Sequence, residues 1–166
     1  MSESPGSGKT SSHPSRYLAF SLGGERYAIP LLSVKEVIAL PEITPVPFSA
    51  PHFMGIMNLR GQVISVVDLR LKLGIKAHAT GETAVVICDL GSFCLGVVVD
   101  SIDSVVAPTA GEISEKPDFP ATRNSDLIVS VFRKDKRLIL LLDIERALTQ
   151  DERRQATESA KGAKAA

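Results

Sequence analysis

The chain has 166 residues, of which 44% are hydrophobic and 23% are charged, a balance typical of a soluble globular domain and not of a disordered chain. The formal net charge is zero, which argues against a nucleic-acid-binding protein, because such proteins neutralise phosphates with clustered lysine and arginine. No apolar run approaches the roughly 20 residues of a membrane span, and the N-terminus lacks a signal-peptide pattern, so a cytoplasmic location is expected.

Residues 1–15 are rich in serine, glycine and proline and have no hydrophobic periodicity, which predicts a flexible tail. Within them, Gly6-Ser7-Gly8-Lys9-Thr10 looks like the end of a phosphate-binding loop. The full motif needs a glycine where Glu3 stands and a strand before it, and the sequence offers neither. We therefore reject a nucleotide-binding site here.

Two predicted hairpins take up equivalent places in the two halves of the chain. In the first, residues 17–22 and 26–29 are strands, and Gly23-Gly24 supplies the positive φ angles of a tight turn. The second has the same order of strand, turn and strand (residues 84–90, 91–92 and 94–99). A short helical turn is predicted after each hairpin, at residues 31–37 and 101–105.

The later part of each half also repeats. Residues 58–70 contain a turn, an apolar strand and an aspartate, and residues 131–146 contain the same series. This order indicates an internal duplication, and the short strands with glycine and proline turns favour two small closed barrels. The runs at 63–67 and 138–142 are apolar without alternation, so we expect strands that are buried on both faces and that pack against the sister barrel.

Residues 41–51 contain four prolines, which predicts an extended edge or surface loop. Ile43, Val46 and Phe48 give this segment an apolar side. Two interpretations remain open: a rigid docking edge, or a lid whose side chains fold back over the barrel.

The sequence offers no catalytic set. His13 lies in the predicted tail, and His52 and His78 lie in loops with no carboxylate or cysteine at ligand spacing. Asp68 and Asp143 each precede a predicted helical turn, where helix capping explains them. Cys88 and Cys94 flank a turn: they either face each other across the hairpin or are two small buried hydrophobic residues in a reducing compartment. We predict neither an enzyme nor a metal or cofactor site.

Arg60 is the strongest candidate for function. The second copy of the repeat keeps the apolar residues and the aspartate but loses Asn58-Leu59-Arg60-Gly61. Arg60 is either a solvated turn residue or a guanidinium placed to bind carbonyls or a carboxylate, and Glu36 is its natural partner if the ends of the first barrel meet. Gly55 and Gly61 would allow close backbone approach there.

These residues resemble the CheW-like domain of bacterial chemotaxis coupling proteins over residues 16–148. The resemblance is carried by five stretches: Ser33-Val34-Lys35-Glu36-Val37, Ile43-Thr44-Pro45-Val46-Pro47, residues 50–61, Val66-Val67-Asp68-Leu69-Arg70 and Gly96-Val97-Val98-Val99-Asp100. It implies a mainly β domain at residues 16–150, made of two intertwined, pseudo-symmetric, SH3-like five-stranded barrels with short helical turns and a C-terminal helix. A frayed polar tail at residues 151–166 would follow.

The resemblance further implies a non-catalytic scaffold without cofactors. Such a protein couples the cytoplasmic tips of methyl-accepting chemoreceptors to the regulatory domain of a CheA-type histidine kinase, and is recruited to receptor arrays at the inner membrane without inserting into it. The receptor helix would bind in a groove lined by Val34, Glu36, Gly55, Arg60, Gly61 and Val105. The kinase would contact Leu40, Ile43 and Val46.

Two alternatives stay open. The same module could serve a chemosensory pathway that does not control flagella, such as one for surface motility. A generic barrel that binds a peptide, an oligonucleotide or a small ligand is disfavoured, because aromatic residues make up only 5% of the chain and tryptophan is absent.

Overall fold

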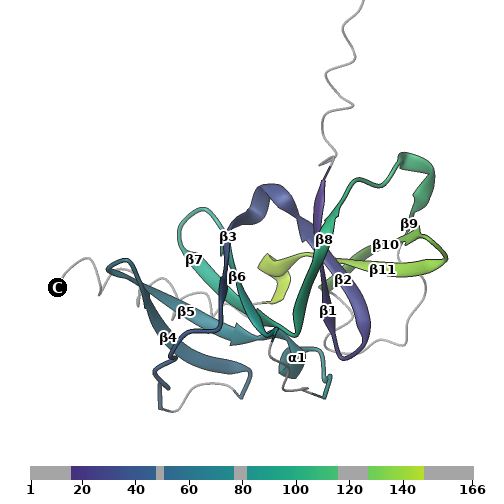
Figure 1. Cartoon of the computed structure of the whole chain (residues 1–166). Coiled ribbons are helices and arrows are strands. Elements are labelled where there is room, and N and C mark those ends of the chain that lie inside the picture. The colour runs from purple at the N-terminus through teal and green to yellow at the C-terminus, as the bar shows by residue number, and fades with distance from the viewer. Residues whose placement is uncertain (1–15, 48–50, 77–81, 116–126, 148–166) are drawn as a thin grey trace, which may run out of the picture.

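A computed structural model describes residues 16–47, 51–76, 82–115 and 127–147. Within them the chain forms two sheets (Figure 1), and the mainly β fold predicted from the sequence is confirmed. Sheet A has six strands in the order β8-β1-β2-β11-β10-β9 and sheet B has five in the order β3-β6-β7-β5-β4. We predicted five strands for each barrel, and the sixth strand of sheet A is β9, which has only three residues.

The strands of sheet A are β1 (Tyr17–Leu22), β2 (Glu25–Pro30), β8 (Ser101–Val106), β9 (Ile113–Glu115), β10 (Ile128–Lys134) and β11 (Arg137–Leu142). Those of sheet B are β3 (Val34–Ala39), β4 (Phe53–Leu59), β5 (Gln62–Asp68), β6 (Ala84–Asp89) and β7 (Cys94–Val99). The α-helix α1 (Leu69–Lys72) follows β5, and 3-10 turns lie at Leu31–Ser33, Ala110–Glu112 and Ile144–Ala147.

The two halves of the chain exchange hairpins. The β1–β2 hairpin belongs to the first half but pairs into sheet A with strands of the second half, and the β6–β7 hairpin makes the reverse exchange. The two exchanges are equivalent, since β2 runs parallel to β11 and β7 runs parallel to β5. The described chain therefore crosses between the sheets only twice, at Leu31–Ser33 and at Asp100.

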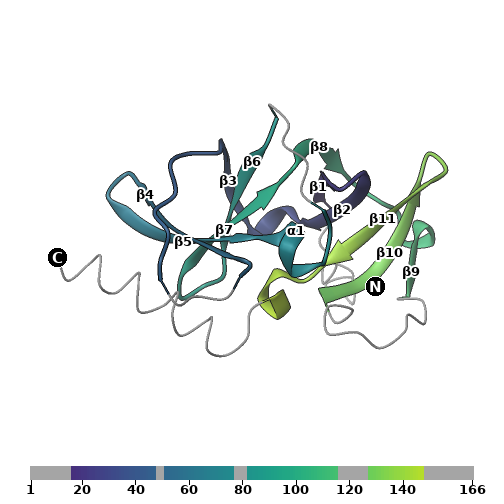
Figure 2. The same cartoon turned by 90° about the horizontal axis from the view of Figure 1, so that it is seen from below.

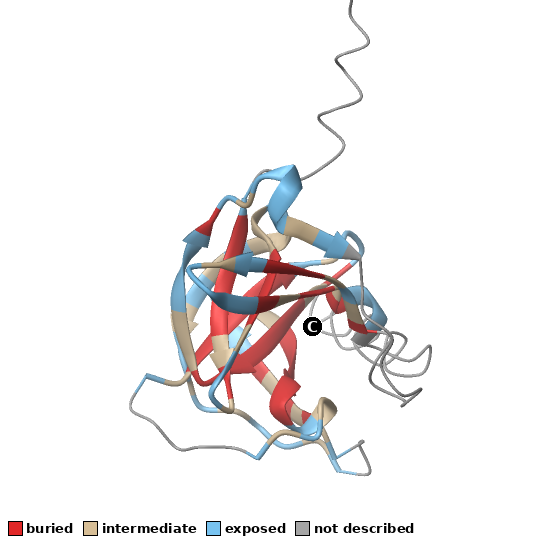
Figure 3. Ribbon diagram, turned by 90° about the vertical axis from the view of Figure 1, so that its right-hand side faces the viewer, coloured by how far each residue is buried: buried red, intermediate tan, exposed pale blue. Residues whose placement is uncertain are grey.

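Three apolar clusters explain how the sheets pack. One lies within sheet A and contains Phe132, and one lies within sheet B and contains Ile64 and Val66. The largest contains residues of both sheets, among them Phe20 and Val67. Figure 3 shows the buried residues concentrated where the strands meet, with exposed residues at their ends. Because neighbours on β5 point into different clusters, the prediction that this strand is buried on both faces is confirmed.

The prediction that residues 138–142, in β11, are also buried on both faces is only partly correct. Ile139 and Leu141 are buried within sheet A, and Leu142 reaches the shared cluster. Leu138, however, is 56% exposed. It lies opposite Arg133, one residue pair from the hairpin turn, in a stretch where residues 135–138 are all exposed.

Two predicted helical turns are corrected. The first 3-10 turn ends at Ser33, and the strand β3 begins at Val34, so Glu36 lies in a strand and not in a turn. Burial alternates along β3, which is the period of a strand. Residues 101–105, also predicted as a turn, belong to β8 and pair with β1.

Closure of sheet B depends on Gly55. After β3 the chain returns to β4, where the Thr44 and Ile56 amides donate to each other's carbonyl oxygens at 2.8 and 2.9 Å. Gly55 has φ +143° beneath this bridge, and a Cβ atom there would overlap the Thr44 carbonyl group. The strand therefore needs a residue without a side chain at this point.

The predicted cap at Asp143 is confirmed, because its Oδ1 accepts from the Glu145 amide at 3.0 Å. The described residues that follow form a 3-10 turn, Ile144–Ala147. This turn occupies the start of the predicted C-terminal helix, so that prediction is corrected for residues 144–147. The rest of that segment, both predicted tails, His13, Phe48 and His78 lie outside the described residues.

The two cysteines are free and do not face each other. Cys88 pairs with Leu95 and Cys94 with Asp89, so the two thiols point to opposite faces of the sheet. Burial, with a smaller effect of nearby Cys94, raises the pKa of the Cys88 thiol to about 12. We expect a thiol reagent at pH 8 to modify Cys94 in the folded protein and Cys88 only after unfolding, as mass spectrometry would show. Rapid modification of both thiols in the folded protein would contradict this expectation.

Candidate functional site

The turn between β4 and β5 holds an arginine in an unfavourable backbone conformation. Arg60 and Gly61 have φ of 52° and 86°, as in a tight primed turn, where glycine, asparagine or aspartate is preferred. The side-chain Oδ1 of Asn58 accepts from the Gly61 amide at 2.8 Å and supports the turn. The equivalent turn of the β10–β11 hairpin has Asp135 and Lys136 at the two positive-φ positions. The fold requires the conformation but not an arginine, so the arginine indicates a role for its side chain.

Arg60 binds Glu36 with both of its terminal nitrogens. Nη1 donates to Oε2 at 2.7 Å and Nη2 donates to Oε1 at 2.8 Å. This hydrogen-bonded pairing lowers the pKa of Glu36 and raises that of Arg60. The pair predicted from the sequence is present, and because 71% of the Arg60 side chain is exposed, its outer face is accessible to a partner.

Apolar residues lie on the same strand as Glu36 and on two other elements at the junction of the sheets. Val34 begins β3, two residues before Glu36, and is half-buried. Val105 is 50% exposed on β8, and Leu32 is 89% exposed on the first 3-10 turn. β3 and β8 are edge strands of the two sheets, and Figure 1 shows them on the same side of the molecule, with the 3-10 turn above the junction between them.

We did not predict Leu32 as a residue of the candidate surface. The sequence feature that indicates its exposure is its place at the centre of a short connection between two strands, where few neighbours cover a side chain. The pattern alone did not distinguish it from Leu31, which packs against the shared cluster.

Of the two glycines predicted for the groove, one lies in an exposed turn and the other is buried in a strand. Gly61 lies in the exposed turn beside Arg60, with nothing within 4 Å of a Cβ placed there, so the close approach expected at Gly61 is wrong. Gly55 does approach another backbone closely, but its neighbour is Thr44. It is buried within β4, where it leaves room for the bridge between Thr44 and Ile56.

The residues suggested for kinase contact are not equally accessible. Leu40 is 43% exposed just after β3. Ile43 is half-buried against the cluster of sheet B, and Val46 is half-buried against the shared cluster. Both packings agree with a lid that covers the barrel.

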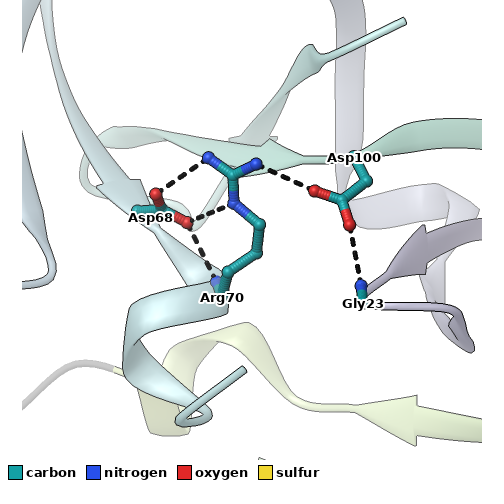
Figure 4. A network of polar contacts seen from close by, with 4 residues as sticks. All are labelled: Gly23, Asp68, Arg70 and Asp100. Carbon is teal, nitrogen blue, oxygen red and sulfur yellow. Dashed lines mark hydrogen bonds and ion pairs between the residues drawn. The ribbon is translucent and has the colours of Figure 1, made fainter. Parts of the chain in front are cut away.

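A buried charge network lies at the other end of the junction (Figure 4). Arg70 donates from Nε and Nη2 to the two oxygens of Asp68, at 2.9 and 3.0 Å, and from Nη1 to Asp100 at 2.8 Å. The other oxygen of Asp100 accepts from the Gly23 amide at 2.7 Å. The pKa of Arg70 is raised, above all by its hydrogen bond to Asp68.

The predicted capping role of Asp68 is also confirmed, since its Oδ1 accepts from the Arg70 amide at the start of α1. The sequence did not reveal that Arg70 and Asp100 join it in a buried cluster. The described residues contain no group of three or more histidine, cysteine, aspartate and glutamate side chains that could hold a metal ion. None of the described helices has the length and apolar character needed to span a membrane.

Comparisons with known proteins agree with this geometry. The model of the CheW-like domain matches residues 16–152. The chain is 31% identical over 137 residues to the chemotaxis protein CheW of Klebsiella aerogenes, covering 82% of each. It is 28% identical over 142 residues to that of Bacillus subtilis, covering 85% of this chain and 91% of the relative.

Among solved structures, the scaffolding protein TtCheW from Thermoanaerobacter tengcongensis is similar with a TM-score of 0.72 at 26% identity, over 79% of this chain and 90% of that one. The predicted family and fold are confirmed, and the predicted role as a chemotaxis scaffold agrees with the names of these relatives. The chain belongs to the CheW-like family.

Proposed function

We propose that this protein is a non-catalytic scaffold that couples the cytoplasmic tips of chemoreceptors to a CheA-type histidine kinase. The relatives named above are chemotaxis and scaffolding proteins. The observation that carries the proposal is the Arg60–Glu36 pair: it is exposed, joined by two hydrogen bonds and held in a turn that the fold alone would not assign to arginine.

The cytoplasmic tip of a chemoreceptor is a helical hairpin, and the candidate surface suits a helix. Leu32, Val34 and Val105 supply apolar anchors, and the charged pair at Arg60 sets the register by hydrogen bonding. Leu40 is the exposed member of the residues proposed for kinase contact. Two surfaces on one chain allow both partners to bind at once, which would recruit the protein to receptor arrays at the membrane.

Charge reversal at Arg60 tests the receptor surface. We expect Arg60→Glu to weaken binding to a chemoreceptor cytoplasmic fragment by about tenfold or more, because it opposes Glu36 with a second carboxylate and removes the guanidinium. The stability of the fold should change little, because the pair is exposed. Isothermal titration calorimetry and thermal unfolding measure the two quantities.

Lys136→Glu is the matched control, since it reverses a charge in the equivalent turn of the β10–β11 hairpin. It should leave receptor binding unchanged. A folded Arg60→Glu protein that binds the receptor fragment as tightly as the unaltered protein would rule out this surface.

The pair also predicts a pH dependence. Because Arg60 lowers the pKa of Glu36 below its ordinary value of 4.5, the pair is intact at neutral pH and is lost only as the pH falls through that lowered value. We expect the NMR titration midpoint of Glu36 to rise in Arg60→Met. An unchanged midpoint would show that the pair does not form in solution.

A further inference from the structure

The second crossing between the sheets is a single residue. β7 ends at Val99 in sheet B, and β8 begins at Ser101 in sheet A, so Asp100 alone joins them. The direction in which β8 leaves this residue determines where its far end lies. That far end carries Val105, on the candidate receptor surface.

Asp100 is held from both sheets. On one side Arg70, in α1 directly after β5, donates to Oδ1 at 2.8 Å. On the other side the Gly23 amide, in the β1–β2 turn, donates to Oδ2 at 2.7 Å, and the Asp100 amide donates to the Ser21 carbonyl at 3.0 Å. Figure 2 shows α1 at the junction between the two sheets. Arg70 belongs to this helix.

Arg70 is itself fixed in orientation. Its guanidinium binds both oxygens of Asp68, which also caps α1. The side chains of Asp68, Arg70 and Asp100 are 8%, 9% and 8% exposed. A forked guanidinium of this kind has little rotational freedom, so a displacement of Asp100 relative to β5 would break or stretch its hydrogen bonds.

Stability alone does not account for such a cluster. Buried ion pairs lose much of their attraction to the cost of desolvation, and apolar residues of similar volume often give an equally stable protein. What the cluster provides and an apolar contact does not is a directional connection between the two sheets.

We propose that Arg70 is a positioning residue that fixes the angle between the two sheets, and with it the spacing between the Val34 and Val105 sides of the receptor surface. Its effect on binding rests on the proposed function. Its effect on the angle does not, and can be measured without a partner.

The first test is a distance measurement on the free protein. Arg70→Lys keeps the charge, but an ammonium group cannot bind both carboxylates through a planar fork. Spin labels at Lys35→Cys on β3 and Ser104→Cys on β8, both exposed positions, report the separation of the sheets in a Cys88→Ala/Cys94→Ala background. We expect a broader or shifted distance distribution in Arg70→Lys.

Arg26→Lys is the matched control. Arg26 pairs with Asp103 at 3.3 Å, and both residues belong to sheet A, so this ion pair does not join the sheets. The same substitution there should leave the distribution unchanged. An unchanged distribution in a folded Arg70→Lys protein would overturn the proposal. If Arg70→Lys does not fold, Asp68→Asn/Arg70→Met/Asp100→Asn takes the same test with the same expected broadening.

The second test measures binding in the unlabelled proteins. We expect Arg70→Lys to weaken binding of a chemoreceptor cytoplasmic fragment, which contacts both sheets, by about tenfold, and to change binding of the kinase regulatory domain by less than about twofold. Equal losses for both partners would overturn the link between the angle and the receptor surface. A broadened distance together with no receptor binding by the unaltered protein would support the positioning role and refute the proposed function.

Discussion

Replacing Arg70 by methionine is expected to lower the free energy of unfolding by about 3–5 kcal/mol, because it leaves two carboxylates buried without their cation. Both carboxylates, Asp68 and Asp100, are hydrogen-bonded to Arg70 and nearly inaccessible to water. Urea unfolding followed by circular dichroism measures the loss. The size of the effect distinguishes a buried cluster from an ion pair on the surface, which contributes about 0–1 kcal/mol.

Arg26→Met provides the comparison, because the Arg26 and Asp103 side chains are 29% and 30% exposed. It should cost no more than about 1 kcal/mol. Asp68→Asn/Arg70→Met/Asp100→Asn should recover much of the loss by removing the unpaired charges together. A loss below about 1 kcal/mol in Arg70→Met would mean that the cluster is hydrated in solution.

Gly55→Ala is expected to destabilise the protein by about 3 kcal/mol or more, because the new methyl group meets backbone and not a movable side chain. The Cβ atom would overlap the Thr44 carbonyl group, and φ of +143° is strained for any residue except glycine. The bridge between Thr44 and Ile56 should break, which opens sheet B where β4 meets the returning chain.

Hydrogen exchange at the Thr44 and Ile56 amides should report this opening directly, and the melting temperature should fall with it. Gly111→Ala is the control, since nothing lies within 4 Å of a Cβ there and its φ is not positive. It should change stability by less than about 0.5 kcal/mol. Normal protection of both amides in Gly55→Ala would show that the strand tolerates a side chain.

The hairpins could be predicted because their signals are local. Gly23-Gly24 sits between two apolar runs, and the turn at Arg60-Gly61 ends one such run and starts another. The Arg60–Glu36 pair followed from the expectation that the ends of one barrel meet, which the pairing in sheet B bears out.

The exchange of hairpins could not be predicted from the residues alone. The residue pattern of β1 or β6 does not indicate which sheet the strand will join, because both strands are apolar on both faces. The choice depends on pairing between residues far apart in the sequence, such as Ala28 with Leu141.

Arg70 was not identified as a buried residue for a similar reason. On a short helix an arginine is usually solvated, and its burial here depends on Asp100, 30 residues later in the chain. β3 was misread because a three-residue turn leads directly into the strand, so the helical pattern and the alternating pattern overlap.

The bridging role is tested most directly by reconstitution with both partners. Chemoreceptor cytoplasmic fragments tethered to vesicles are sedimented with the CheA-type kinase of the same genome, with and without this protein. We predict that the kinase sediments with the receptors when the protein is present, that Arg60→Glu greatly reduces this recruitment, and that Lys136→Glu does not. A folded protein that fails to bring kinase and receptor into one complex would contradict the assignment as a coupling scaffold.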